Sequence, residues 1–194
     1  MTHTIFAAIA AAALFAGSAL AWSPSAGQER DLQVGKAVAE VVAAPHGAAM
    51  IHGAIDIDAP ARAIWQVMTD CQRVPRMITN LASCRVLERN PDGRSLVRET
   101  VTRGSPFIGP IRNVVREDYE PYSRIRFARV GGDLRIEQGQ WVLQPLAGGA
   151  TRVIYDNLVA ADIAAPAALV RMGIRHDTAK VLENLRRECG PPRA

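Results

Sequence analysis

Hydrophobic and polar residues alternate along most of the chain between residues 48 and 161, which is the pattern of half-buried β-strands. In the segment 48–57, Ile51, Ile55 and Ile57 fall on one face of a strand. Turn sequences such as NPDG at 90–93 and LAGG at 146–149 separate the later segments. Short connections favour antiparallel neighbours, so the pattern predicts a meander. The further strands are expected near 84–90, 94–103, 111–120, 123–131, 134–145 and 151–161.

Two segments have helical spacing instead. The first begins at Asp58-Ala59-Pro60, where Asp58 can cap free amides and Pro60 suits a first turn. About ten residues follow, with Ile64, Trp65, Val67 and Met68 on one side, and the helix is expected to end near residue 70. A short irregular or helical piece is expected around 74–78.

The second helix is predicted over 167–189, before the Gly-Pro-Pro sequence at 190–192. Val170, Ile174, Val181 and Leu185 fall within an arc of about 60° on a 3.6-residue wheel, with Thr178 beside them. The arginines and lysine of the segment lie outside this arc. This long helix is therefore expected to place one apolar face on the sheet.

The N-terminal region divides into two parts. Residues 5–16 (IFAAIAAAALFA) carry no charge and are followed by Ala19-Leu20-Ala21, a pattern typical of a secretory signal peptide cleaved after Ala21. The alternative is a retained membrane anchor, but the apolar core is shorter than the roughly 18–20 residues that span a bilayer. Residues 22–33 are polar and suit a flexible start, and 35–44 have a Val/Ala pattern that suits an extra strand. We expect export, most simply to a bacterial periplasm.

The composition sets limits on the function. The 194 residues are 48% hydrophobic, 22% charged and 5% aromatic, which excludes a disordered or collagen-like chain and indicates one folded domain. A net charge of +4 is small for a dedicated nucleic-acid-binding protein, so no nucleic acid is expected as a partner. The sequence contains no nucleophile elbow, phosphate loop, dinucleotide fingerprint or metal-ligand spacing. We therefore predict no catalytic residue, metal or cofactor.

The cysteines and histidines add one structural prediction. Cys71 and Cys84 are separated by 12 residues, and in an oxidising compartment they are expected to form a disulfide, which leaves Cys189 without a cysteine partner. The alternative is three unpaired thiols. His52 has no evident partner in the sequence, and His176 lies on the helix side away from the apolar arc.

The chain contains the motifs IDAP at 57–60, IW at 64–65, TD at 69–70, CRVLE at 84–88, GQW at 139–141 and GGATRV at 148–153. In this order they resemble motifs of START-like domains, and more narrowly of the polyketide cyclase/dehydrase and coenzyme Q-binding branch of the SRPBCC superfamily. This resemblance covers roughly residues 48–189. It implies an α+β helix-grip fold, in which a curved antiparallel sheet wraps around a long C-terminal helix and a ligand cavity lies between them. The domain would then occupy 48–190, after the signal peptide at 1–21 and the N-terminal segment at 22–47.

The residues themselves favour an incompletely filled interior, because aromatic side chains are few and the helix arc holds medium-sized residues. Polar residues alternate with apolar ones in three strands, and any that face inward must be paired or meet a ligand. The alternative is that these faces meet solvent. We predict a ligand site formed by Trp65, Val97, Glu99, Phe107, Ile108, Val115, Glu117, Tyr119, Phe127, Trp141, Tyr155, Val170, Ile174, Thr178 and Val181.

The loop at 104–110 is expected at the mouth of this cavity, together with 131–133 and 160–166. Phe107 and Ile108 lie at its tip between Arg103 and Arg112. An apolar tip with basic flanks suits transient contact with a membrane surface. The alternative is that both side chains fold back into the core.

Three functions remain open at this point. The first is an exported protein that binds, and in one version carries, a hydrophobic small molecule such as a lipid, isoprenoid or quinone. The second is a cyclase- or dehydratase-like enzyme, which requires ionisable groups with shifted pKa values converging inside the cavity. The third is a ligand-free interaction module, which requires a filled interior and an exposed apolar patch.

Overall fold

The computed structural model describes residues 22–104, 109–162 and 166–190. These residues form one antiparallel sheet in the order β1-β2-β8-β7-β6-β5-β4-β3. Strands β3 to β8 follow one another as a meander, and β2 pairs with β8. The strands are β1 (Val38–Ala44), β2 (Ala48–Ile57), β3 (Leu81–Arg89), β4 (Ser95–Thr102), β5 (Arg112–Glu120), β6 (Arg124–Gly132), β7 (Ile136–Pro145) and β8 (Thr151–Ala160).

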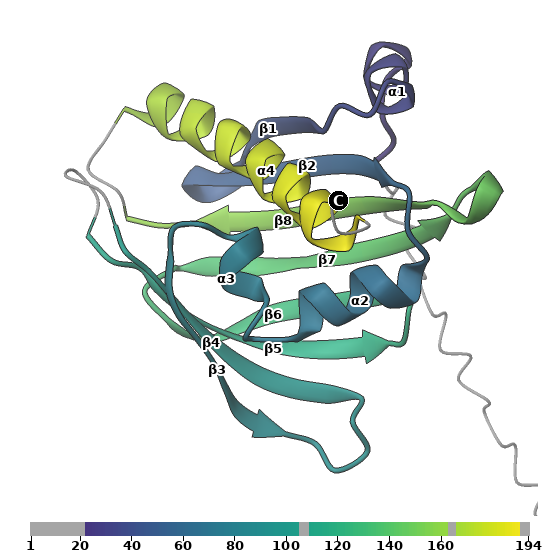
Figure 1. The fold of residues 1–194 in the computed structure, drawn as a ribbon. Helices are drawn as coiled ribbons and strands as arrows, with labels where there is room; N and C mark the ends of the chain where they lie inside the picture. Colours follow the sequence, from purple (N-terminus) through teal and green to yellow (C-terminus); the bar gives the residue numbers. More distant parts are fainter. Residues whose placement is uncertain (1–21, 105–108, 163–165, 191–194) are drawn as a thin grey trace, which may run out of the picture.

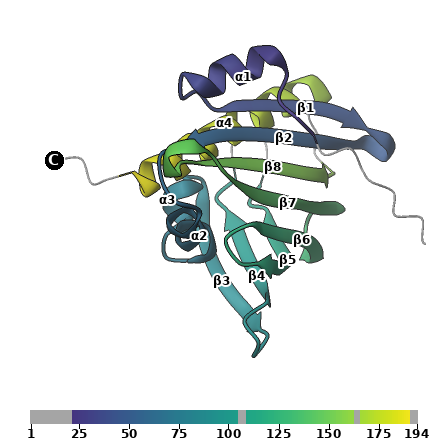
Figure 2. The same ribbon diagram turned by 90° about the vertical axis from the view of Figure 1, so that its right-hand side faces the viewer.

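Three helices cover the concave face of the curved sheet, and α1 lies beside β1 (Figures 1 and 2). This arrangement is the predicted α+β helix-grip fold. The meander is confirmed, and the largest shift of a strand boundary is at β3, which begins at residue 81 rather than 84. No described helix is long and apolar enough to cross a membrane. The helices are α1 (Ala26–Gln33), α2 (Ala61–Thr69), α3 (Val74–Met77) and α4 (Ala167–Cys189).

The C-terminal helix α4 has the predicted bounds and packs chiefly on β1 and β2. A Cβ atom on Gly53 of β2 would lie 3.0 Å from Leu182 Cδ1 and 3.1 Å from Thr178 Cγ2, so the missing side chain lets the helix approach the strand. Leu182 and Leu185 are fully buried here, while the predicted arc residues nearer the N-terminus of α4 are only part-buried. Helix α4 therefore packs on the sheet mainly through its C-terminal half.

The N-terminal segment is more ordered than its polar sequence suggests. Helix α1 occupies part of the segment predicted to be a flexible start, because Ser25 and Gln28 form a reciprocal capping box and Leu32 is buried. Arg152 on β8 also binds the Glu29 carboxylate, with Nη1 2.7 Å from Oε1. The Val/Ala segment forms strand β1, close to the extra strand suggested for 35–44.

The start of α2 differs from the prediction. Pro60 occupies the N-cap position, and no side chain caps the helix. Asp58 lies two residues earlier, so its carboxylate is not at the position that reaches the free amides of the first turn. The carbonyl of Ala59 instead accepts a hydrogen bond from Thr151 Oγ1 at 2.8 Å, which ties the segment to β8.

The predicted disulfide is present. Cys71, in the turn between α2 and α3, is bonded to Cys84 on β3, with 5.3 Å between the Cα atoms. A loop of this length stabilises the fold by about 3 kcal/mol in the chain-entropy view. Cys189 at the end of α4 is a free thiol.

Gly139 on β7 lies opposite Phe127 on β6, and a Cβ there would sit 2.0 Å from the Asp156 carbonyl oxygen and 2.7 Å from Phe127 Cζ. Replacing Gly139 with alanine should therefore lower the free energy of unfolding by about 1–3 kcal/mol. A Cβ on Gly173 in α4 would have no atom within 4 Å, so Gly173→Ala should raise it by about 0.5–1 kcal/mol. Urea unfolding of both variants measures these changes, and equal effects would contradict the packing described.

Candidate functional site

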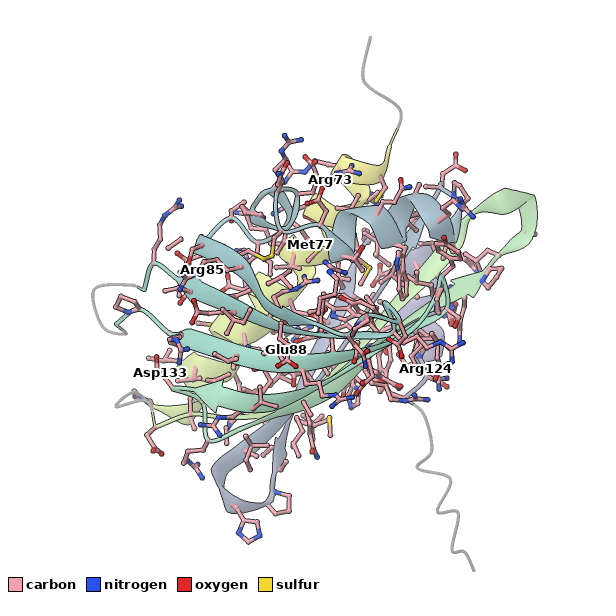
Figure 3. The ribbon with its side chains drawn as sticks, turned by 90° about the horizontal axis from the view of Figure 1, so that it is seen from below. Arg73, Met77, Arg85, Glu88, Arg124 and Asp133 are labelled. Carbon is pink, nitrogen blue, oxygen red and sulfur yellow. A yellow bond between two sulfur atoms is a disulfide. The ribbon has the colours of Figure 1, made fainter. Side chains whose placement is uncertain are left out.

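An inner cavity of about 130 Å³ lies on the concave face, between strands β4–β8 and the helices α2 and α3. None of its lining residues comes from α4. Helix α3, with Met77 labelled in Figure 3, lies beside the C-terminal end of α4. The helical side contributes Met68, Val74, Met77 and Ile78, and the strands contribute Arg98, Thr100, Asn113, Val115, Glu117, Ile125, Phe127, Glu137, Trp141 and Tyr155.

An outer pocket of about 340 Å³ lies between the N-terminal half of α4 and strands β2 and β8. Val159 lines this pocket and pairs in the sheet with Glu137, which lines the inner cavity, so the two spaces are neighbours on one face. Arg171 is its single charged lining residue among those described. The others are Gly47, Ala48, Ala49, Ile51, Ile111, Leu134, Val159, Ala160, Ala161, Ala167, Val170 and Ile174.

A buried ion pair forms one wall of the inner cavity. Arg98 Nη2 lies 3.0 Å from Glu117 Oε2, and Arg98 Nη1 donates to the Met68 carbonyl at 3.0 Å. The Tyr119 hydroxyl donates to the same Glu117 oxygen at 2.6 Å. Burial, together with the Glu117 charge, raises the pKa of Tyr119 above its ordinary value. The phenol therefore stays protonated and holds the carboxylate in place.

Three polar atoms of the cavity lining have no hydrogen-bond partner among the described residues: Arg98 Nε, Asn113 Oδ1 and Glu137 Oε2. Leaving such groups unpaired costs about 1–3 kcal/mol each. Burial also raises the pKa of Glu137 to about 7. The cavity thus offers one cationic donor, one amide acceptor and one carboxyl group that titrates near neutral pH.

Aromatic rings from β6, β7 and β8 form another part of the cavity lining. The ring centroids of Trp141 and Tyr155 lie 4.2 Å apart, and Phe127 stacks on Tyr155 at 6.1 Å. The Tyr155 hydroxyl accepts from Asn157 Nδ2 at 2.9 Å, and burial raises the pKa of Tyr155 above its ordinary value. This part of the lining is suited to packing against a flat or apolar molecule.

The predicted site residues divide between the two spaces and the surrounding core. Trp65 packs edge-on against Tyr119 and Tyr122 and does not line either space. Thr178 lies against Gly53, and Val181 packs on the core beneath α4. Phe107 and Ile108 lie outside the described residues. Those lining the inner cavity are Val115, Glu117, Phe127, Trp141 and Tyr155, and those lining the outer pocket are Val170 and Ile174.

Glu99 and Val97 lie on the opposite face from the cavity, which corrects the prediction for these two positions. Their neighbour Arg98 points inward, and side chains alternate along a strand. Glu99 is buried under Arg85 and Arg112, with Arg112 Nε 2.6 Å from Oε2. The hydrogen bond from Arg85, followed by that from Arg112, holds the Glu99 pKa below its usual range. In Figure 3, Arg85 lies at the same end of the sheet as Asp133.

Arg98 and Glu137 were missed by the sequence reasoning. Glu137 falls two and four residues before Gly139 and Trp141, so its inward direction follows from that of Trp141 by strand alternation. His52 also needs correction, because it does have partners. Its Nδ1 lies 2.7 Å from Asp156 Oδ1, and its ring stacks on Trp22.

Residues 57–186 match the sequence model of the family described as polyketide cyclase / dehydrase and lipid transport. No curated protein matches the chain. Among solved structures, a START superfamily protein from Mycobacterium smegmatis is 17% identical, with a TM-score of 0.63 over 72% of this chain and 96% of that one. A STAR-related lipid transfer protein from Xanthomonas axonopodis is 15% identical, with a TM-score of 0.62 over 78% and 98%. The Zhui aromatase/cyclase from Streptomyces is 13% identical, with a TM-score of 0.61 over 73% and 93%.

The buried Arg98–Glu117 pair can be tested by a double-mutant cycle. Arg98→Leu leaves the Glu117 carboxylate buried without its cation, so the free energy of unfolding should fall by about 3–5 kcal/mol. The double variant Arg98→Leu, Glu117→Leu should lose less than the sum of the two single changes. Urea unfolding measures each.

The exposed pair of Arg116 and Asp118, 3.0 Å apart, is the matched control. Arg116→Leu should change the free energy of unfolding by less than about 1 kcal/mol. Strictly additive losses at Arg98 and Glu117 would contradict the coupling described here.

Proposed function

The chain belongs to the polyketide cyclase / dehydrase and lipid transport family, and on this premise we propose that it binds a hydrophobic small molecule with a polar head on the concave face of its sheet. The supporting observation is that a small cavity lined by both polar and apolar side chains adjoins a larger, mostly apolar pocket. A void of about 150 Å³ accepts a benzene-sized ring. The inner cavity, at about 130 Å³, suits a ring-sized head, and the outer pocket suits an apolar chain.

The three polar cavity atoms that lack a hydrogen-bond partner limit which polar groups the head of the ligand can carry. Arg98 Nε can donate a hydrogen bond to an acceptor on the ligand, and Asn113 Oδ1 can accept one from a donor on the ligand. Glu137 accepts when ionised and donates when protonated. A quinone or quinol with an isoprenoid chain, or a hydroxylated lipid, supplies such groups next to an apolar tail. Relatives named for lipid transfer share the fold, which agrees with this class of ligand.

We also propose that the protein is exported to the periplasm after cleavage behind Ala21. The uncharged segment at 5–16, the small residues before position 22 and the Cys71–Cys84 disulfide support this, because disulfides persist in oxidising compartments. A carrier there would take up and release its ligand by transient contact with a membrane surface.

The second candidate is a cyclase- or dehydratase-like enzyme. The observation in its favour is that Glu137, with a pKa of about 7, shares the inner cavity with the Tyr155 phenol. A general base works best when its pKa lies near the working pH. This candidate requires Glu137→Gln to abolish turnover of a bound substrate while leaving its affinity nearly unchanged.

Filling the outer pocket tests the binding proposal. Ile174→Trp should weaken binding of decyl benzoquinone or farnesol by about tenfold or more, because the indole occupies the space of the chain. Isothermal titration calorimetry measures the affinity, and mass spectrometry of an organic extract detects lipid that copurifies with the protein.

Leu169→Trp is the matched control, since Leu169 lies on the same helix, is exposed and lines neither space. The Leu169→Trp variant should bind decyl benzoquinone and farnesol with the same affinity as the wild type. Absence of lipid in extracts from several expression hosts, together with no binding across the panel, would contradict the proposal.

Binding of a neutral ligand should depend on pH through Glu137. Besides burial, a hydrogen bond with the Asn113 side chain lowers the pKa of Glu137, the Glu117 charge raises it and the Arg129 charge lowers it. A ligand that excludes the remaining water further favours the protonated carboxyl. Affinity should therefore be constant well below pH 7 and fall above it, by up to about tenfold per pH unit. Glu137→Gln should give a flat profile, and identical profiles for variant and wild type would refute this role.

A further inference from the structure

Strand β1 is an edge of the sheet with one free side. It pairs with β2, and no other described strand or backbone hydrogen bond reaches its outer side. In Figure 2, β1 lies next to α1 at the end of the row of strands. An edge of this kind presents a row of unpaired N–H and C=O groups that can pair with another extended chain.

This edge lies at the floor of a groove between two helices. Two adjoining hollows of about 390 and 450 Å³ share Gln28 of α1, Ala39 of β1, and Met172 and Arg175 of α4. Residues 37–41 form the floor. We call this feature the β1 groove.

The two helices lie on opposite sides of the sheet, so they form the two walls of the groove. Leu32 of α1 packs on Val38, Ala54 and Ile154, which point away from α4. Helix α4 packs on the other face of β1 and β2, at Gly53. A strand added to β1 would therefore present alternate side chains to α4 and to α1.

The walls differ in charge. The α4 wall carries Arg171, Arg175 and His176, whereas the α1 side carries Asp31, and Glu40 lies on the floor strand. Met172 is 65% exposed between the two arginines, and methionine adapts readily to varied partners. The groove thus combines free backbone groups, an apolar contact and one basic wall.

We propose that the β1 groove binds an extended segment of a partner protein, which adds to β1 as a further strand and directs carboxylate side chains towards α4. Backbone hydrogen bonds to β1 provide affinity, and Arg171 and Arg175 select acidic residues at every second position. The proposal does not rest on the ligand proposed for the concave face, although Arg171 lines both the β1 groove and the outer pocket.

The charges disfavour a second copy of this chain as the occupant. Two β1 strands paired antiparallel about a two-fold axis bring like faces together, so α4 meets α4 and the arginine wall meets itself. The Glu40 side chains would also share one face. A membrane is disfavoured too, because lipid cannot satisfy the backbone groups of a sheet edge.

The test uses a synthetic peptide in which glutamate alternates with threonine. Addition to the folded protein should shift the backbone amide resonances of residues 38–44, which NMR spectroscopy detects even for weak binding. Methylation of alternate peptide nitrogens on the paired side should abolish the shifts, because it removes the strand hydrogen bonds.

Two charge-reversal variants on α4 distinguish a local effect of the β1 groove on peptide binding from a general effect of the protein's net charge. Arg175→Glu should weaken peptide binding by about tenfold or more. Lys180→Glu changes the net charge equally but lies outside the groove, so its effect should stay below about threefold. Circular dichroism verifies that both variants are folded.

Four results would overturn the proposal: no amide shifts in β1 with the peptide, equal loss in the two variants, unchanged binding of the methylated peptide, or concentration-dependent dimers that Arg175→Glu stabilises. Binding to phosphatidylglycerol vesicles without any response to the peptide would likewise assign this surface to a membrane instead.

Discussion

The close contact between α4 and β2 at Gly53 sets the geometry of the whole concave face. A helix can rest on a curved sheet at only part of its width, and α4 packs on the β1–β2 side, where a glycine lets Leu182 and Thr178 approach the backbone. Strands β4 to β7 curve away from it and need another cover. Helices α2 and α3 provide that cover, with the Cys71–Cys84 bond fastening their connection to β3.

Covering a sheet with short helices leaves space, and the side chains around this space explain why it is polar. Arg98 and Glu117 are almost fully buried and form an ion pair, held in place by Tyr119 and by the Met68 carbonyl. Burial of two charges rarely stabilises a fold more than apolar residues of similar size would. Stability alone therefore does not explain this pair beside the Glu137 oxygen that has no hydrogen-bond partner, and the proposed ligand would give these groups a partner.

The opposite face has a different organisation. There α1 is anchored by Leu32 and by the Glu29–Arg152 ion pair, while Trp22 stacks on His52. Trp22, Glu29, Leu32 and His52 precede the segment that matches the family, which spans residues 57–186, whereas Arg152 lies within it. Helix α1, strand β1 and all but the last residue of β2 precede this segment, and the β1 groove is formed where α1 and β1 meet α4.

The sequence alone determined the strand meander, the C-terminal helix and the disulfide, because these depend on local periodicity, turn residues and spacing. The helix from 167 to 189 and the Cys71–Cys84 pair are examples. It also predicted Glu117 and Tyr155 among the ligand-site residues, because apolar residues two positions away share their face, but it left open whether that face meets solvent. Only the tertiary structure decided which face of β4 lines the cavity. Glu99 alternates with valines, yet Arg98 points inward, because a partner on β5 neutralises Arg98 and two arginines on neighbouring strands cover Glu99. Which side chains of a strand face the cavity depends here on their partners on neighbouring strands, and the hydrophobic pattern of a single strand carries no information about those partners.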